Sequence, residues 1–274
     1  MIGGIIGDIV GSIYEFHNIK TKDFPLFSKY CDFTDDSILT VATADWLLRG
    51  GKVTKYYSMY AANNDSPMGG YGSGFRQWIT RTIEDGDFSP YNSCGNGSAM
   101  RVGPVGWLSN EIPQLNEKLI LNKAKESAEC THNHPEGIKG AQATALCIYL
   151  ARKGTSIDDI RKRIEKDFCY DLSMCVEELR PRYSWGGLDE TGNGGTCQGS
   201  VPQAIICALD ATDFEDAIRN AISIGGDSDT IGCITGSIAE ALYDIPNDIR
   251  QKGMNYLPNE FIKVIDEFEN KFGK

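Results

Sequence analysis

The sequence predicts an all-α fold, and three features of the residue pattern support this prediction. Apolar residues recur every three or four positions through much of the chain, a spacing that places them on one face of a helix. Sustained apolar–polar alternation and β-branched runs bounded by turns, which would indicate strands, are sparse. No linker, repeat or low-complexity tract divides the sequence. We therefore expect residues 1–274 to form a single compact multi-helix domain.

The expected helices follow one another along the chain. In residues 36–48, one helical face carries Ile38, Leu39, Ala42, Trp46 and Leu47. The same periodicity predicts helices over residues 115–128, 137–151, 214–224, 231–242 and 258–268. Small residues (Gly232, Gly236 and Ala239) lie on one side of the 231–242 helix and permit close packing. We therefore expect this helix to be buried at the centre of the domain.

Three long segments lack this periodicity and are rich in glycine and polar residues. They cover residues 63–73, 85–104 and 180–200. Long loops in a compact domain commonly carry function, so these segments are candidates for ligand binding.

The composition is typical of a soluble globular protein, with 41% hydrophobic and 24% charged residues. The formal net charge of −11 repels a phosphate backbone, which argues against non-specific nucleic-acid binding and favours a bound cation. Residues 1–10 are apolar but lack a basic leading segment, and no apolar run approaches the roughly 20 residues that span a bilayer. We expect a cytoplasmic monomer without membrane contact.

The cysteines indicate a reducing compartment. There are nine, an odd number, and no two are spaced as CxxC. Several lie in apolar runs, where they serve as small buried side chains. Cys130 and His132 lack a second pair with matching spacing, so a zinc site is a poor explanation for them.

Two acidic segments, residues 33–37 and 225–230, are the main functional signal. The first carries Asp35 and Asp36, the second Asp227 and Asp229, and each set lies among hydroxyl residues at the start of an expected helix. Helix capping is one explanation, because such side chains accept hydrogen bonds from free backbone amides. Capping requires only one or two of these residues per helix, however, and both segments carry more.

A metal site is the second explanation. Carboxylate and hydroxyl oxygens are hard ligands that suit Mg²⁺, Mn²⁺ or Ca²⁺ rather than Zn²⁺. If the four aspartates converge, two divalent cations would neutralise their charge. Such metals can orient vicinal hydroxyls and activate water. Residues 93–101 form a glycine-rich segment that could present amides to an anion such as a pyrophosphate, although glycine-rich turns are common.

Five motifs occur in order along nearly the whole chain. They are Gly-Asp-Ile-Val-Gly at 7–11 followed by Glu15, Thr-Asp-Asp-Ser at 34–37, Gly-Asn-Gly-Ser-Ala-Met-Arg at 95–101, Thr-His at 131–132, and Gly-Asp-Ser-Asp-Thr at 226–230. Together they resemble the motifs of the ADP-ribosylglycohydrolase family, which includes dinitrogenase-reductase-activating glycohydrolase. Ser37 and Ser228 replace threonines of the family pattern but keep the hydroxyl group.

This resemblance implies an all-α fold with a central cleft that holds two Mg²⁺ or Mn²⁺ ions. The implied metal ligands are Thr34, Asp35, Asp36, Asp227, Asp229 and Thr230. Glu15 would be the catalytic carboxylate, with Asp35 or Asp36 as the second choice. The implied substrate-binding residues are Ser93, Gly95, Asn96 and Gly97, around the pyrophosphate, and His132, beside the ribose.

The resemblance further implies a metal-dependent hydrolase that releases ADP-ribose from a modified protein or other acceptor, by cleavage at the distal ribose. A non-catalytic, metal-stabilised ADP-ribose-binding protein and a metal-dependent phosphohydrolase remain alternatives. The 183–197 loop does not identify the acceptor. We expect Arg101 to pair with an acidic residue. Tyr183 and Trp185 either stack on adenine or pin their loop to the core.

Overall fold

The computed structural model describes residues 1–109, 112 and 114–273, so Lys274, the last residue of the expected domain, lies outside it. The first half of the chain forms α1 (Ile2–Gly11), α2 (Asp35–Arg49), α3 (Val53–Asn63), α4 (Ser73–Glu84), α5 (Gly97–Met100), α6 (Gly103–Gly106), α7 (Glu117–Glu129) and α8 (Pro135–Arg152). The second half forms α9 (Ile157–Phe168), α10 (Val176–Leu179), β1 (Tyr183–Ser184), β2 (Gly187–Leu188), α11 (Cys197–Leu209), α12 (Phe214–Ser223), α13 (Ser228–Leu242), α14 (Asn247–Met254) and α15 (Asn259–Phe272).

The all-α prediction is confirmed. Each of the six expected helices is present, and among the described residues the strands are limited to the two-residue pair β1 and β2, which is antiparallel. Two expected loops are shorter than predicted, because α5 lies within 85–104, α6 begins at Gly103, and α11 begins at Cys197, before residue 200. Helices α5 and α6 have only four residues each, too few for an apolar stripe, and α11 is buried on nearly all sides, so periodicity does not reveal them.

Helices α1 and α13 form the centre of the molecule. All ten residues of α1 are buried, as are the first twelve of α13, which confirms the expected central helix. The two helices approach so closely that a Cβ atom on Gly7 would lie 1.9 Å from the Gly232 carbonyl oxygen. Gly3 and Gly236 make a similar contact about one turn away. Their packing is therefore backbone against backbone, which only glycine permits.

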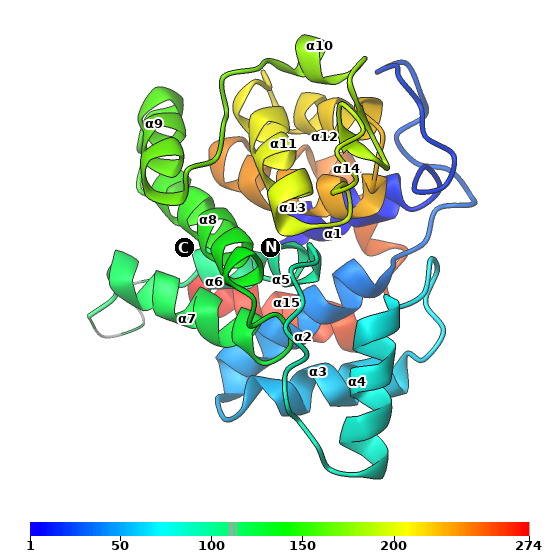
Figure 1. The fold of residues 1–274 in the computed structure, drawn as a ribbon, viewed down its shortest axis with the longest axis vertical. Helices are drawn as coiled ribbons and strands as arrows, with labels where there is room; N and C mark the ends of the chain where they lie inside the picture. Colours follow the sequence, from blue (N-terminus) through cyan, green and yellow to red (C-terminus); the bar gives the residue numbers. More distant parts are fainter. Residues whose placement is uncertain (110–111, 113, 274) are drawn as a thin grey trace.

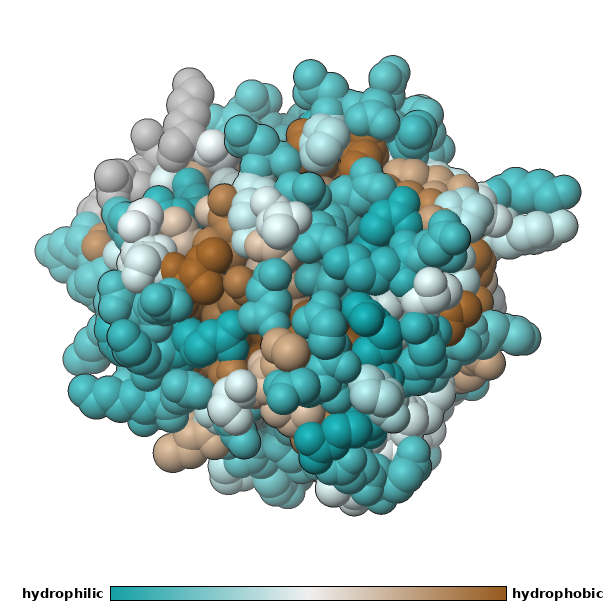
Figure 2. Space-filling model, turned by 90° about the horizontal axis from the view of Figure 1, so that it is seen from above, coloured by the Kyte–Doolittle hydropathy of each residue, from teal (hydrophilic) through white to brown (hydrophobic). Residues whose placement is uncertain are grey.

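The other helices surround this pair. In Figure 1, α2, α3 and α4 lie on one side of α1 and α13, and α11 and α12 lie on the other. Helix α8 also packs against α13, and α15 packs against α2. The face shown in Figure 2 is mainly hydrophilic, with apolar side chains in small separate groups. None of the helices in the described part of the chain has the length and apolar content needed to cross a bilayer.

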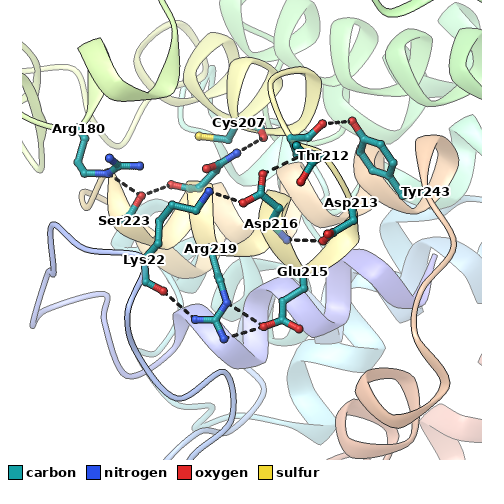
Figure 3. A network of polar contacts seen from close by, with 12 residues as sticks. Lys22, Arg180, Cys207, Thr212, Asp213, Glu215, Asp216, Arg219, Ser223 and Tyr243 are labelled. Atoms are coloured by element: carbon teal, nitrogen blue, oxygen red, sulfur yellow. Dashed lines mark hydrogen bonds and ion pairs between the residues drawn. The ribbon is translucent and has the colours of Figure 1, made fainter.

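The long segment between α1 and α2 is tied to α12 (Figure 3). Lys22 forms an ion pair with Asp216, and the Arg219 guanidinium donates to the backbone oxygens of Lys22 and Phe24, both at 2.8 Å. Charge-assisted bonds of this kind hold an extended segment in one position. The residues that follow α1 therefore have a fixed place on the body of the protein.

The backbone contact between α1 and α13 predicts the effect of Gly7→Ala. The added methyl group would overlap the Gly232 carbonyl, so the two central helices must separate or shift. We expect the free energy of unfolding to fall by about 1–3 kcal/mol or more, as in other overpacked cores. Denaturant unfolding of the purified variant measures this change.

Gly72→Ala is the matched control. Nothing lies within 4 Å of a Cβ atom at this position, so the substitution should change stability by less than about 1 kcal/mol. Equal stability of the two alanine variants would show that α1 and α13 are not in backbone contact.

Candidate functional site

The two acidic segments meet where α2 and α13 begin, and capping explains only part of their composition. Thr34 is the N-cap of α2, and its hydroxyl accepts a hydrogen bond from the Asp36 amide. Asp227 occupies the N-cap position of α13, but its side chain makes no capping hydrogen bond. Capping therefore accounts for Thr34 and leaves the carboxylates to be explained by another role.

The carboxylates converge in two groups that share Asp229. Oxygens of Asp8, Asp36 and Asp229 lie within 4.8 Å of one another, and so do oxygens of Glu15, Asp227 and Asp229. The structure thus brings together Asp227 and Asp229 of the second acidic segment and Asp36 of the first. Asp8, from α1, and Glu15, from the loop after α1, join them. Each group could hold a metal ion through oxygen ligands.

The remaining expected ligands lie close by but differ in their contacts. Asp35 lines the adjoining cavity and is in neither three-carboxylate group. The Thr230 hydroxyl donates to Asp36 Oδ2 at 3.3 Å. Thr34 is fully buried and does not line the cavity, and its hydroxyl donates to Asp8 Oδ1 at 2.7 Å.

Asp8 is a site residue that sequence reasoning missed. It is completely buried on α1 and accepts hydrogen bonds from the backbone amides of Thr34 (3.0 Å) and Ser37 (3.1 Å), as well as from both hydroxyls. The available signal was a single charged residue within an otherwise apolar helix, because such a charge is buried only when it is paired or hydrogen-bonded.

Burial and mutual repulsion raise the pKa values of these groups. Burial raises the pKa of Asp8 to about 6, against the lowering effect of its hydroxyl and amide donors. Burial, with the charges of Asp227 and Asp8, raises the pKa of Glu15 to about 7. The pKa values of Asp36 and Asp229 are well above the ordinary range, mainly through burial and then through neighbouring carboxylates.

The donor set fits a hard divalent cation. Asp36 Oδ1 is buried and has no hydrogen-bond partner within the described residues. An unpartnered buried carboxylate oxygen is costly, and a cation bound there would offset both the lost hydration and the repulsion among the acids. Carboxylates with a threonine hydroxyl nearby are the ligands that Mg²⁺ and Mn²⁺ prefer.

A cavity of about 430 Å³ opens beside the carboxylates. All five expected substrate-binding residues line it: Ser93, Gly95, Asn96, Gly97 and His132. The Asn96 side-chain amide donates to Asp227 Oδ2 at 2.7 Å and to the Ser200 hydroxyl at 3.1 Å, so the glycine-rich segment is joined directly to the acidic cluster. The volume is within the usual range for small-molecule sites.

His132 forms a neutral wall of this cavity. Burial, with the nearby charge of Arg101, lowers its pKa well below the ordinary value, and its Nδ1 lies 2.8 Å from the Thr131 hydroxyl. A Cβ atom on Gly97 would lie 3.2 Å from His132 Nε2. Glycine at position 97 therefore allows the imidazole to approach the backbone of the glycine-rich segment.

The expectation that Arg101 pairs with an acid is wrong. Its guanidinium lies over the Tyr57 ring, 4.1 Å from the centroid, and donates to the Ser127 carbonyl (2.9 Å) and the Thr131 hydroxyl (2.7 Å). The side chain is fully buried, where a π face and neutral acceptors hold the charge instead of a carboxylate. Its Nε and Nη1 have no hydrogen-bond partner among the described residues, and Arg101 also lines the cavity.

Hydrogen bonds fix the loop that carries Glu15. The Asn18 side-chain amide donates to the carbonyls of Tyr14 (2.7 Å) and Gly226 (2.8 Å) and accepts from the Gly226 amide (2.8 Å). Gly226 has a φ angle of +79°, which glycine adopts readily, and it directly precedes Asp227. One side chain thus sets the position of Glu15 relative to Asp227.

The two aromatic residues of the hairpin have different positions. Tyr183 is buried, packs against Gly226 and donates to the Gly194 carbonyl, so it pins the loop. Trp185 lines the cavity, is 40% exposed, and donates its indole N–H to the Glu15 carbonyl. Its ring is stacked on Phe16, with centroids 5.9 Å apart.

Comparisons with known proteins show the family and the fold that this chain resembles. The model of a family described as ADP-ribosylglycohydrolase matches residues 1–272. The chain is 26% identical to ADP-ribosylhydrolase ARH3 of Homo sapiens, over 98% of this chain and 88% of that protein. It is 24% identical to ADP-ribosylarginine hydrolase Tri1 of Pseudomonas putida, over 97% and 72%. A solved structure, an ADP-ribosylglycohydrolase-related protein complex, shares the fold with a TM-score of 0.66, 22% identity, and coverage of 98% and 93%.

The raised carboxyl pKa values predict how the stability of the metal-free protein depends on pH. Between about pH 4 and 7, the folded cluster holds protons that the unfolded chain has released, so the free energy of unfolding falls as pH rises. One such proton corresponds to at most about 1.4 kcal/mol per pH unit within its window. Denaturant unfolding in EDTA from pH 4.5 to 7.5 should show this loss of stability. In Asp229→Asn, the free energy of unfolding should fall less per pH unit.

Asp158→Asn supplies the control, since Asp158 is exposed in the first turn of α9, outside the site. In this variant, the free energy of unfolding should fall with pH as steeply as in the parent protein. Stability that stays constant or rises over this range in EDTA would contradict the repulsion described above.

Proposed function

Because the chain belongs to the ADP-ribosylglycohydrolase family, we propose that it is a metal-dependent hydrolase that releases ADP-ribose from an ADP-ribosylated target. The observation that carries the proposal is the convergence of Glu15, Asp36, Asp227 and Asp229 beside a cavity lined by the glycine-rich segment and His132. The printed names of the relatives, an ADP-ribosylhydrolase and an ADP-ribosylarginine hydrolase, support the substrate class. The bond cleaved would be the glycosidic bond at the distal ribose.

We propose two Mg²⁺ or Mn²⁺ ions as cofactors, bound where the two carboxylate groups meet. The residues that would hold them are Asp35, Asp36, Asp227, Asp229 and Thr230, with Asp229 placed to serve both. Thr34 would act through Asp8, because its hydroxyl is already bonded to that carboxylate. When bound, hard divalent ions supply positive charge that orients ribose hydroxyls and activates water.

Glu15 is the proposed proton carrier. Burial is the main cause of the raised pKa of Glu15, and a carboxyl group whose pKa is shifted towards neutrality can both accept and return a proton, as general acid–base catalysis requires. Its position is held by Asn18 and by the Trp185 indole. Carboxylates around the anomeric carbon would also stabilise the oxocarbenium-like transition state of glycoside hydrolysis. Asp35 and Asp36 are the second choice for the proton carrier.

The substrate would lie along the neutral and cationic walls of the cavity. Ser93, Gly95, Asn96 and Gly97 would contact the pyrophosphate, and His132 the ribose. A neutral imidazole can donate or accept a hydrogen bond with a sugar hydroxyl without adding charge. Arg101 would contribute its buried positive charge on the same side, where two of its nitrogens lack a partner within the described residues.

The proposed function predicts free ADP-ribose as the product and a strong effect of Glu15→Gln. We expect the parent protein with Mg²⁺ to release ADP-ribose from at least one of ADP-ribosylated arginine, serine, a nucleobase or O-acetyl-ADP-ribose. Glu15→Gln should reduce kcat on that substrate by about 10²–10⁴-fold, because glutamine cannot carry the proton. Chromatographic product analysis separates ADP-ribose from AMP.

Glu84→Gln, on the exposed end of α4, is the matched control and should retain parental kcat. AMP as the product would indicate a phosphohydrolase, and binding without turnover would indicate a non-catalytic ADP-ribose-binding protein. A loss of less than about fivefold in Glu15→Gln would move the proton-carrying role to Asp35 or Asp36.

The cofactor proposal predicts that metal stabilises the protein. At a free metal concentration about 100 times the dissociation constant, one site adds roughly 2.7 kcal/mol to the free energy of unfolding. Mg²⁺ or Mn²⁺ should therefore raise Tm, measured by calorimetry against an EDTA sample. The gain should vanish in the double variant Asp227→Asn with Asp229→Asn.

In EDTA, that double variant should be at least as stable as the parent, since it removes two repelling charges from the cluster. Helix caps would behave differently, losing about 1–2 kcal/mol per cap with or without metal. A parent protein whose Tm does not respond to either metal would refute the proposed cofactor.

A further inference from the structure

A second cavity, of about 470 Å³, lies between the start of α8, the 169–174 segment, the β-hairpin and α11. It shares no lining residue with the first cavity. The hairpin separates the two, because Trp185 lines the first and Leu188 lines the second. The proposed function uses none of the residues around this second cavity.

Unpartnered polar groups gather at its wall. Tyr170 and Gln203 are only 5% and 6% exposed, yet the Tyr170 hydroxyl and Gln203 Oε1 have no hydrogen-bond partner among the described residues. Gln198 Oε1 is a third such atom, and Glu136 Oε2, which lies 3.2 Å from the Lys139 ammonium group, is a fourth. Native proteins leave few buried polar atoms unpaired, so four around one cavity point to a ligand that would satisfy them.

Helix α11 adds one more acceptor to the same wall. Pro202 lies inside this helix and has no amide hydrogen, so the Gln198 carbonyl does not receive its helical hydrogen bond. Gln198 and Pro202 both line the cavity. The unpartnered buried atoms of this wall are therefore mainly acceptors, together with the Tyr170 hydroxyl, which can donate or accept.

The charges around the cavity disfavour an anion. Its one lysine, Lys139, is already engaged, with its ammonium group 3.2 Å from the Glu136 carboxylate and 4.4 Å from the centroid of the Tyr170 ring. Glu136 and Asp171 also line the cavity, so the lining carries one more negative than positive charge. A ligand that donates hydrogen bonds and carries no negative charge would match these walls.

The opposite walls are apolar. Met174, Leu179, Leu188 and Ile206 complete the lining. A ligand that fits the whole cavity therefore combines a polar head with an apolar body, the usual division of a small-molecule site. We propose that the second cavity binds a small molecule that presents N–H donors, as a carboxamide or an amidinium, on an apolar body.

Three probes of the same shape test the proposal: benzamide, benzamidine and benzoate. We expect benzamide and benzamidine to bind the full chain with dissociation constants of about 1 mM, and benzoate not to bind, because it offers only acceptors and a negative charge. Amide chemical shifts in a ¹H–¹⁵N NMR titration with Mg²⁺ present measure the affinity. The shifts should map to α11 and the 169–174 segment.

Gln203→Leu and Tyr170→Phe should each weaken benzamide binding about three- to tenfold. Both variants should fold as well as the parent, because neither loses a hydrogen bond. Thr144→Val is the matched control: it also removes an unpartnered buried oxygen, but Thr144 does not line the cavity, so affinity should not change. Equal binding of benzoate and benzamide, shifts confined to the first cavity, or unchanged affinity in Gln203→Leu would overturn the proposal.

Discussion

The repulsion among buried carboxylates is the constraint on which this site depends, and the close packing of α1 and α13 is what opposes it. A Cβ atom on Gly11 would lie 2.5 Å from the Asp229 Cα, so a glycine in the last turn of α1 lets the first turn of α13 touch it. That contact brings Asp229 beside Asp8. The apolar core thus holds together charges that would separate in water, and the stability of the helix pair compensates for their repulsion.

Asp8 and Asp36 have different hydrogen-bond partners and are therefore suited to different roles. Asp8 accepts hydrogen bonds from the amides and hydroxyls of Thr34 and Ser37, which fixes it against the start of α2. Asp36 keeps one oxygen without any partner among the described residues. Asp8, whose carboxylate accepts several hydrogen bonds, is suited to positioning its neighbours. Asp36, which has an oxygen without a hydrogen-bond partner among the described residues, has a lone pair available for a cation. Identical side chains acquire distinct roles from their hydrogen bonds alone.

Apolar periodicity was sufficient to predict the all-α fold, and composition was sufficient to single out the two acidic segments and the glycine-rich segment, whereas the roles of individual site residues came from the resemblance to a family. Helix α12 has a one-sided apolar stripe and was predicted, whereas α11 is buried on all sides and has no such periodicity. The placement of Asp8 and Arg101 depends on contacts with residues 26 to 30 positions away, such as Thr34 and Thr131. No spacing rule reveals such partners, so Asp8 was missed and Arg101 was assigned the wrong kind of partner.

The first cavity has the buried residues Asn96 and His132 on the side of the glycine-rich segment and the exposed Trp185 on the side of Glu15, next to Phe16, which is outside the lining. Phe16 is 66% exposed and Trp185 is 40% exposed, and the two rings are stacked. Under the proposed function, the ADP-ribose unit is common to all substrates and would occupy the buried walls, where shape is fixed. The acceptor would leave past Phe16 and Trp185, on loops whose residues can change without disturbing the core. Recognition of the shared unit and choice of the acceptor would therefore reside in structurally separate parts of one cavity, and the Trp185 indole, bonded to the Glu15 backbone, connects them.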